Sequence, residues 1–167
     1  LARIAREATF VLEPGRVAID GHDVTAAIRT PEIDRAASAV ACLPGVREVL
    51  VARQRAMGRG AGLVMEGRDI GTVVFPGADV KIYLDASPEE RARRRARDPA
   101  HAGAADGVTT VARALADRDR SDRTRPVSPL AVAPDAIVID TTTLSIDQVV
   151  EAVMAVVRRA QERPRSR

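Results

Sequence analysis

Residues 62–91 read GLVMEGRDIGTVVFPGADVKIYLDASPEER. The apolar runs 62–66 and 80–85 predict two short, buried strands, and Gly67 to Thr72 predicts the loop after the first. Serine, proline and two glutamates at 87–90 predict a capping box that opens an arginine-rich helix ending near residue 98. Strand, loop, strand and helix in this order are typical of an α/β fold.

The C-terminal part of the sequence extends the same pattern. Residues 99–108 are Ala, Gly and polar residues and predict a loop, followed by a helix from about Thr109 to Arg123. Ala136 to Asp140 predicts a third apolar strand. A second capping box, at 145–148, opens a last helix that we expect to end near residue 163. The order of elements from residue 62 predicts a parallel sheet covered by helices.

The first sixty residues predict a different module. Residues 8–13 and 16–20 read as short strands around Pro14-Gly15, which predicts a hairpin, with a third short strand or a turn in the next ten residues. Two helices follow, one from Thr30-Pro31 to about Leu43 and one over 46–57. We therefore expect a small antiparallel sheet with two helices.

The composition argues against some classes of function and favours others. The 167 residues are 46% apolar, which predicts a globular chain, and Phe10, Phe75 and Tyr83 are the only aromatic residues. Base stacking on aromatic side chains is thereby nearly excluded. The net charge is +3, and apart from Lys81 the positive charge is arginine, which suits bidentate contact with phosphate.

A lone cysteine, Cys42, lies in an apolar run and is expected to pack in the core. The sequence shows no cluster of Cys and His with metal-ligand spacing, so no metal ligands are predicted. Without a secretory signal or a long apolar span, the expected compartment is the reducing cytoplasm, with no membrane partner.

Three groups of charged residues are candidates for binding. Arg118, Asp122 and Arg125 share one face if the helix reaches 125, and form either a solvated, salt-bridged face or an anion clamp. On the arginine-rich helix, Arg91, Arg94 and Arg95 share a face. That face is either solvated and open to nucleic acid, or a site for the polyphosphate of a nucleotide.

The third group is Gly67-Arg68-Asp69, at the carboxyl end of a predicted strand. Ligands of open α/β sheets bind at that edge. Arg68 offers a fork for a phosphate, and Asp69 accepts hydrogen bonds.

Four segments resemble the signatures of bacterial cytidylate kinases (CMP/dCMP kinases). They are EGRDIGTVVFP at 66–76, KIYLDASPEER at 81–91, RDRSDRTRP at 118–126 and DTTTLSI at 140–146. Residues 36–40 and 46–50 resemble the same family, so the likeness spans essentially the whole chain in order. It implies the P-loop nucleoside monophosphate kinase fold, with an inserted CMP-binding module at 1–61. The kinase core would be 62–167, with a lid at about 97–109 and the first strand or strands missing.

The resemblance also implies an activity and roles for single residues. The activity is transfer of the γ-phosphoryl group of ATP, with Mg²⁺, to CMP or dCMP, by an enzyme that is monomeric when complete and binds no nucleic acid. Arg68 and Arg125 are implied as catalytic contacts to phosphate. The implied cytosine contacts are Ser38, Arg47 and Asp69, the ribose contacts Arg118 and Asp122, and the ATP-side residues Arg91, Arg94 and Arg95.

One part of such a kinase has no match. The family needs a glycine-rich loop with a lysine that cradles the ATP phosphates and helps to hold Mg²⁺. Residues 58–62 are glycine-rich but lack the lysine, and Lys81 lies inside a predicted strand. We therefore expect an N-terminally truncated kinase that is inactive alone, with most Mg²⁺ ligands in the missing part. The alternative is a non-catalytic remnant that binds nucleotides or RNA through its arginines.

Overall fold

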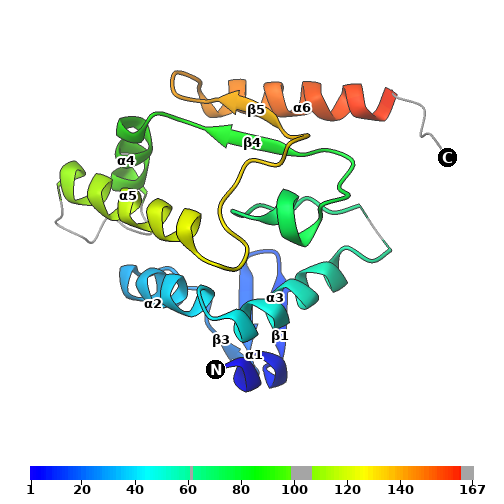
Figure 1. The fold of residues 1–167 in the computed structure, drawn as a ribbon, viewed down its shortest axis with the longest axis vertical. Helices are drawn as coiled ribbons and strands as arrows, with labels where there is room; N and C mark the ends of the chain where they lie inside the picture. The colour runs from blue at the N-terminus through cyan, green and yellow to red at the C-terminus, as the bar shows by residue number, and fades with distance from the viewer. Residues whose placement is uncertain (61, 99–106, 163–167) are drawn as a thin grey trace.

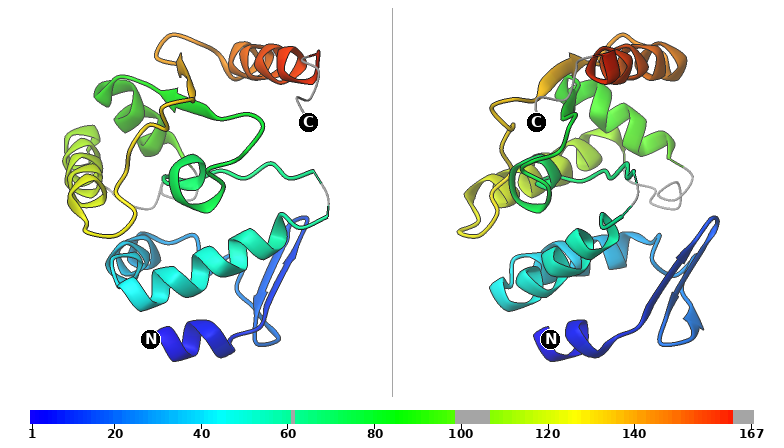
Figure 2. Two further views of the ribbon diagram at one scale, coloured as in Figure 1. Left: turned by 45° about the vertical axis from the view of Figure 1, so that its right-hand side comes forward. Right: turned by 90° about the vertical axis from the view of Figure 1, so that its right-hand side faces the viewer.

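The computed structural model describes residues 1–60, 62–98 and 107–162. Two groups of elements lie one above the other, with the N-terminal group below and the strands and helices from β4 onward above (Figure 1). The turned views in Figure 2 show the same separation. The module boundary expected near residue 61 lies outside the described residues and stays a prediction.

The N-terminal group contains the expected antiparallel sheet. Its strands, in the order β1-β2-β3, are β1 (Phe10–Glu13), β2 (Arg16–Ile19) and β3 (His22–Asp23). The register pairs Phe10 with Ile19 and Glu13 with Arg16, so Pro14-Gly15 forms the turn of the hairpin. Gly15 has a φ of 77°, a conformation that glycine adopts without steric cost. Both the hairpin and the third strand are confirmed.

The three helices of this group pack on one another beside the sheet (Figure 2). The N-terminal α1 (Ala2–Glu7), which we did not predict, packs against α3 (Pro44–Met57). Arg53 of α3 donates hydrogen bonds of 2.7 Å to the carbonyl oxygens of Arg6 and Ala8 and lies 4.9 Å above the Phe10 ring. α2 (Pro31–Ala41) begins as predicted, with the Thr30 hydroxyl accepting from the Ile33 amide. One arginine thus holds α1, β1 and α3 together.

The second group is built on two parallel strands. These are β4 (Ile82–Asp85) and β5 (Ile137–Asp140), paired from Ile82 with Ile137 to Asp85 with Asp140. Around them lie the remaining helices, α4 (Pro88–Arg97), α5 (Val108–Thr124) and α6 (Ile146–Glu162). The capping box at Ser145 and Gln148 forms in full, while at Ser87 only the hydroxyl contact to the Glu90 amide forms. The Glu90 carboxylate instead pairs with Arg93 and Arg94.

The prediction of a first strand in this group is wrong. Residues 62–66 form no strand, and Val64 is fully exposed. An isolated strand is not stable because its amides and carbonyls need a neighbouring strand, and no strand among the described residues lies beside this segment. The predicted loop after it contains a short π-helical turn, η1 (Ile70–Val74), instead.

Two expectations about burial are also wrong. The strand predicted to be buried at 80–85 is partly open to solvent, with Leu84 53% exposed, and Val138 of the third apolar strand is 55% exposed. Only two strands pair in this sheet, within the described ranges, so the outer edge of each strand has no neighbouring strand there. Cys42 is exposed rather than in the core, because it caps the C-terminal end of α2.

The two groups contact each other through α3 and η1. Arg55 of α3 donates to the carbonyl oxygens of Val73 and Val74, at 2.6 and 3.0 Å. At Gly58 a Cβ atom would lie 2.7 Å from the Phe75 ring, so the close approach requires glycine. These contacts hold the end of η1 and Phe75 against α3.

The uncovered strands predict the behaviour of the 167-residue chain in solution. We expect it to self-associate, because unpaired strand edges and exposed apolar side chains are templates for pairing with another chain. Light scattering after size exclusion should detect oligomers, and Val64→Lys combined with Val138→Lys should reduce them. Val127→Lys, at an exposed site outside both residues 62–66 and the β4–β5 sheet, is the matched control. A cooperative thermal melt of a monomeric wild-type chain would contradict the prediction.

Candidate functional site

The carboxyl end of α5 carries a buried charged cluster. Asp122 and Arg125 are only 6% and 8% exposed, so the solvated-face interpretation of this group does not hold for them. Arg125 Nη1 donates to Asp122 Oδ1 at 3.1 Å, and its Nε donates to the Ser128 carbonyl. The Leu130 amide donates to the Asp122 carbonyl at 2.7 Å, which holds the chain after the helix against it. α5 ends at Thr124, and Arg125 is its C-cap.

Arg68 reaches this cluster from the loop before η1. Its Nη1 lies 2.7 Å from Asp119 Oδ1 and 2.9 Å from Asp122 Oδ2. At residue 67 a Cβ atom would lie 2.8 Å from the Ile70 side chain, so the turn that delivers Arg68 requires glycine. The structure thus brings together Arg68, Asp122 and Arg125, which we predicted separately from two distant motifs.

Asp119 is a member of the cluster that the sequence analysis missed. It is 6% exposed and pairs through Oδ1 with Arg68 and through Oδ2 with Arg91 of α4. Burial alone would raise the pKa of Asp119, but the hydrogen bonds from Arg68 and Arg91 outweigh it and lower that pKa below the ordinary value. The carboxylate is therefore charged at neutral pH.

A second buried ion pair involves Asp69, which directly follows Arg68 in the sequence. Arg47 of α3 donates to Asp69 Oδ2, and their side chains are 12% and 10% exposed. These are two of the three residues predicted to contact cytosine. The third, Ser38, lies on α2, and its side chain is outside what the structure describes.

Several buried atoms of these residues have no hydrogen-bond partner among the described residues. They are Arg47 Nε, Arg91 Nε, Arg118 Nε, Arg125 Nη2 and Asp122 Oδ2, the last of which is still ion-paired with Arg68. Leaving a buried polar group without a partner costs about 1–3 kcal/mol. All five atoms belong to residues predicted to contact substrate, so a polar ligand is the natural source of the missing bonds.

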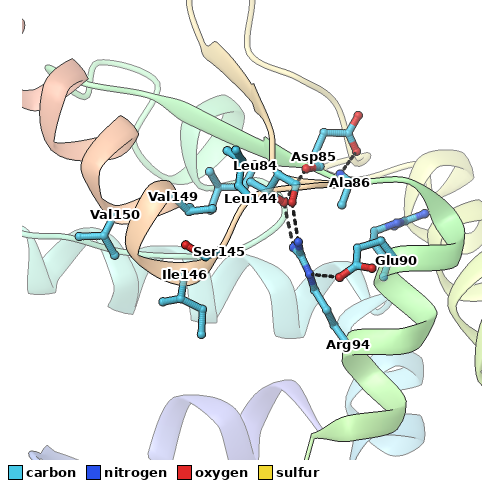
Figure 3. A pocket seen from close by; sticks show the side chains of 12 residues that line it. Leu84, Asp85, Ala86, Glu90, Arg94, Leu144, Ser145, Ile146, Val149 and Val150 are labelled. Carbon is cyan, nitrogen blue, oxygen red and sulfur yellow. Dashed lines mark hydrogen bonds and ion pairs between the residues drawn. The ribbon is translucent and has the colours of Figure 1, made fainter.

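The other two predicted ATP-side arginines are engaged elsewhere. Arg94 donates to the Thr141 hydroxyl at 2.9 Å and to its carbonyl, which fastens α4 to the end of β5 (Figure 3). Arg95 pairs with Asp34 of α2 and so joins the N-terminal module to α4. Both still line one hollow, together with Arg68, Arg91, Asp98 and Leu115. Their roles toward ATP stay predictions.

The predicted lid at 97–109 lies largely outside the described residues, which omit 99–106. Lys81, predicted to lie inside a strand, directly precedes β4 and donates to Asp135 at 2.7 Å and to the Pro76 carbonyl. Among the described residues, no three His, Cys, Asp or Glu side chains gather so as to hold a metal ion. No helix in the described ranges is long and apolar enough to cross a bilayer.

Parallel strands flanked by helices, with convergent arginines beside the loop at 67–69, are the architecture of nucleoside monophosphate kinases. The chain belongs to the cytidylate kinase family, whose model matches residues 1–159. Proteins named cytidylate kinase are similar to it in Solibacter usitatus (48% identity, 95% of this chain and 69% of the relative) and Pelotomaculum thermopropionicum (50%, 84% and 62%). Another, in Vibrio cholerae, is 50% identical over 83% of this chain and 62% of the relative. The matched region thus spans between 62% and 69% of the length of these curated relatives.

Proposed function

We propose that this protein transfers the γ-phosphoryl group of ATP to CMP or dCMP, giving ADP and CDP or dCDP. The observation that carries the proposal is the buried network in which Arg68 and Arg125 converge on Asp119 and Asp122. Family membership and the names of the relatives support the same substrate. In this proposal the chain holds the acceptor-binding part, and the loop that cradles the ATP phosphates lies outside it.

The acceptor phosphate is the centre of the proposed mechanism. An oxygen of the CMP phosphate attacks the γ-phosphorus, the bond from that phosphorus to the bridging β-oxygen breaks, and ADP leaves. The transition state carries its charge on peripheral oxygens, so catalysis needs positioning and charge neutralisation rather than a protein nucleophile. Arg68 and Arg125 supply both, because each keeps guanidinium nitrogens that the carboxylates of α5 do not occupy.

The same network supports a ribose site beside the proposed phosphate site. We assign Arg118 and Asp122 to the ribose hydroxyls. Arg118 Nε is buried without a partner in the described residues, and Asp122 is buried one turn further along α5. A donor and an acceptor on one helix suit a hydroxyl, which donates one hydrogen bond and accepts others.

Recognition of cytosine falls to Ser38, Arg47 and Asp69. Cytosine presents an amino donor and a ring acceptor where uracil presents a carbonyl and a ring donor. The Asp69 carboxylate accepts from the amino group, and Arg47 donates to the ring acceptor. A buried carboxylate facing the uracil carbonyl would lack a partner, which is the costly mismatch that separates such substrates.

ATP and Mg²⁺ complete the proposal. Mg²⁺ is held chiefly by substrate phosphates and water, with one or two protein carboxylates. We assign most of its protein ligands, and the lysine that cradles the phosphates, to the part of the enzyme outside this chain. Arg91, Arg94 and Arg95 border the hollow that we assign to the ATP side.

The test uses protein expressed from the complete coding sequence. With ATP and Mg²⁺, we expect ADP release that depends on CMP or dCMP, and CDP or dCDP visible by phosphorus NMR. UMP should be a much poorer acceptor. The absence of CMP-dependent ADP release would overturn the proposal, and tight RNA binding without turnover would favour a non-catalytic remnant.

A further inference from the structure

We infer that Asp119 is a positioning residue that sets the guanidinium groups of Arg68 and Arg91 together, and so ties the acceptor site to the ATP side. The inference rests on the proposed function. It adds to that function a residue that makes no direct contact with either nucleotide.

The Asp119 carboxylate lies between the guanidinium groups of Arg68 and Arg91 and accepts a hydrogen bond from each. Its Oδ1 accepts from Arg68 Nη1 at 2.7 Å, and its Oδ2 accepts from Arg91 Nη1. The three residues come from three elements, the loop before η1, α4 and α5. Because each oxygen serves one arginine, moving or neutralising this carboxylate disturbs both guanidinium groups at once.

Burial separates this pairing from an ordinary surface salt bridge. The Asp119 side chain is 9% exposed, whereas Arg120 and Asp117, paired on the same helix, are 75% and 60% exposed. Surface pairs contribute little because water screens and replaces them. A buried carboxylate between two guanidinium groups offsets the repulsion that otherwise drives the two cations apart.

The remaining surfaces of the two arginines face a common space. Arg68 and Arg91 both line the hollow between the loop at 67–69, α4 and α5, and their side chains are 30% and 37% exposed. Arg91 also keeps a buried Nε without a partner in the described residues. Asp119 therefore holds one corner of each guanidinium group and leaves the rest available to phosphate oxygens. A phosphoryl group in transit between ATP and CMP needs cations from both sides.

If Asp119 positions both arginines, one substitution at this residue should change the kinetics with both CMP and ATP. Asp119→Asn keeps the shape and removes the charge. In the enzyme from the complete coding sequence, it should raise KM for CMP and for ATP and lower kcat/KM about 10- to 100-fold, because displaced catalytic groups cost rates of this order. Asp117→Asn removes the same charge from an exposed site on the same helix and should leave both KM values unchanged.

A double-mutant cycle then separates positioning from general damage. Asp119→Asn should cost less in the Arg91→Ala background than in the wild type, because the part of its effect that acts through Arg91 is already lost and only the part through Arg68 remains. Independent losses that multiply in the double variant would overturn the inference. So would a fall in kcat with both KM values unchanged, which is the result of a smaller folded fraction.

A second variant keeps the inference testable if Asp119→Asn does not fold. Asp119→Glu retains the charge and moves the carboxylate by one methylene. It should fold and still raise both KM values, and wild-type kinetics in this variant would overturn the inference. An active wild-type enzyme with unaffected Asp119 variants refutes only the positioning role, whereas a wild type inactive on CMP refutes the proposed function and this role together.

Discussion

Arg68→Ala is expected to lower kcat/KM for CMP by about 10³-fold, the low end of the effect of an arginine that stabilises a phosphoryl transition state. The low end applies because Arg125 shares the acceptor phosphate in the proposed mechanism. Both carboxylates that hold Arg68 remain in the variant, at Asp119 and Asp122, so the site loses one positive charge and becomes less favourable for a phosphate. Steady-state kinetics with CMP varied at saturating ATP measures the loss.

Two further variants make the Arg68 prediction specific. Arg68→Lys keeps the charge but not the planar fork, so we expect it to recover only part of the lost activity. Arg93→Ala removes an arginine from α4 whose side chain is 53% exposed and pairs with Glu90, and it should leave activity near the wild-type level. An Arg68→Ala enzyme within about threefold of wild type would remove Arg68 from the phosphate site.

The elements predicted correctly from the sequence are those that local interactions determine. The Thr30 cap with Pro31, and Ser145 with Gln148, each satisfy amides of the helix that follows within three residues. The turn at Pro14-Gly15 is equally local, since its conformation depends on glycine. No distant contact is needed to place these elements, so a single sequence indicates them.

The segments predicted wrongly depend on partners far along the chain. The apolar run at 62–66 has the composition of a strand, but a strand also needs a neighbour, and Val64 stays fully exposed without one. The helix α1 was missed because its stability comes from packing against α3 and from Arg53, more than forty residues away. Cys42 looked buried by composition, yet it falls at a helix end.

The residues of the candidate site also separate into those with local sequence signals and those whose partners lie far along the chain. The spacing of Arg118, Asp122 and Arg125 indicates a shared face if the helix reaches 125, but α5 ends at Thr124, and Arg125 meets Asp122 from the C-cap position. Asp119 stood out in no such pattern because its partners, Arg68 and Arg91, lie 51 and 28 residues away. Its spacing of three residues from Asp122 was the available signal, since residues three apart also share a face. Only the fold reveals that both carboxylates meet the same arginine.

The ion pair between Arg47 and Asp69 predicts a change in base selectivity. Asp69→Ala is expected to lower kcat/KM for CMP by about 2–4 kcal/mol of transition-state binding, or roughly 30- to 900-fold. The loss for UMP should be smaller, because the carboxylate that we assign to the cytosine amino group has no matching partner on uracil. The ratio of kcat/KM for CMP to that for UMP therefore falls, and parallel kinetics with the two nucleotides measures it.

The pairing also complicates the interpretation of Asp69→Ala, because it leaves Arg47 buried without its counter-ion. Combining it with Arg47→Ala removes that uncompensated charge, so part of the lost stability should return while selectivity for CMP does not. Asp79→Ala, at an exposed carboxylate ten residues further along, is the matched control and should preserve the CMP-to-UMP ratio. A double variant that regains wild-type selectivity would mean that Asp69 only neutralises Arg47, and the assignment of the cytosine edge to this carboxylate would then be wrong.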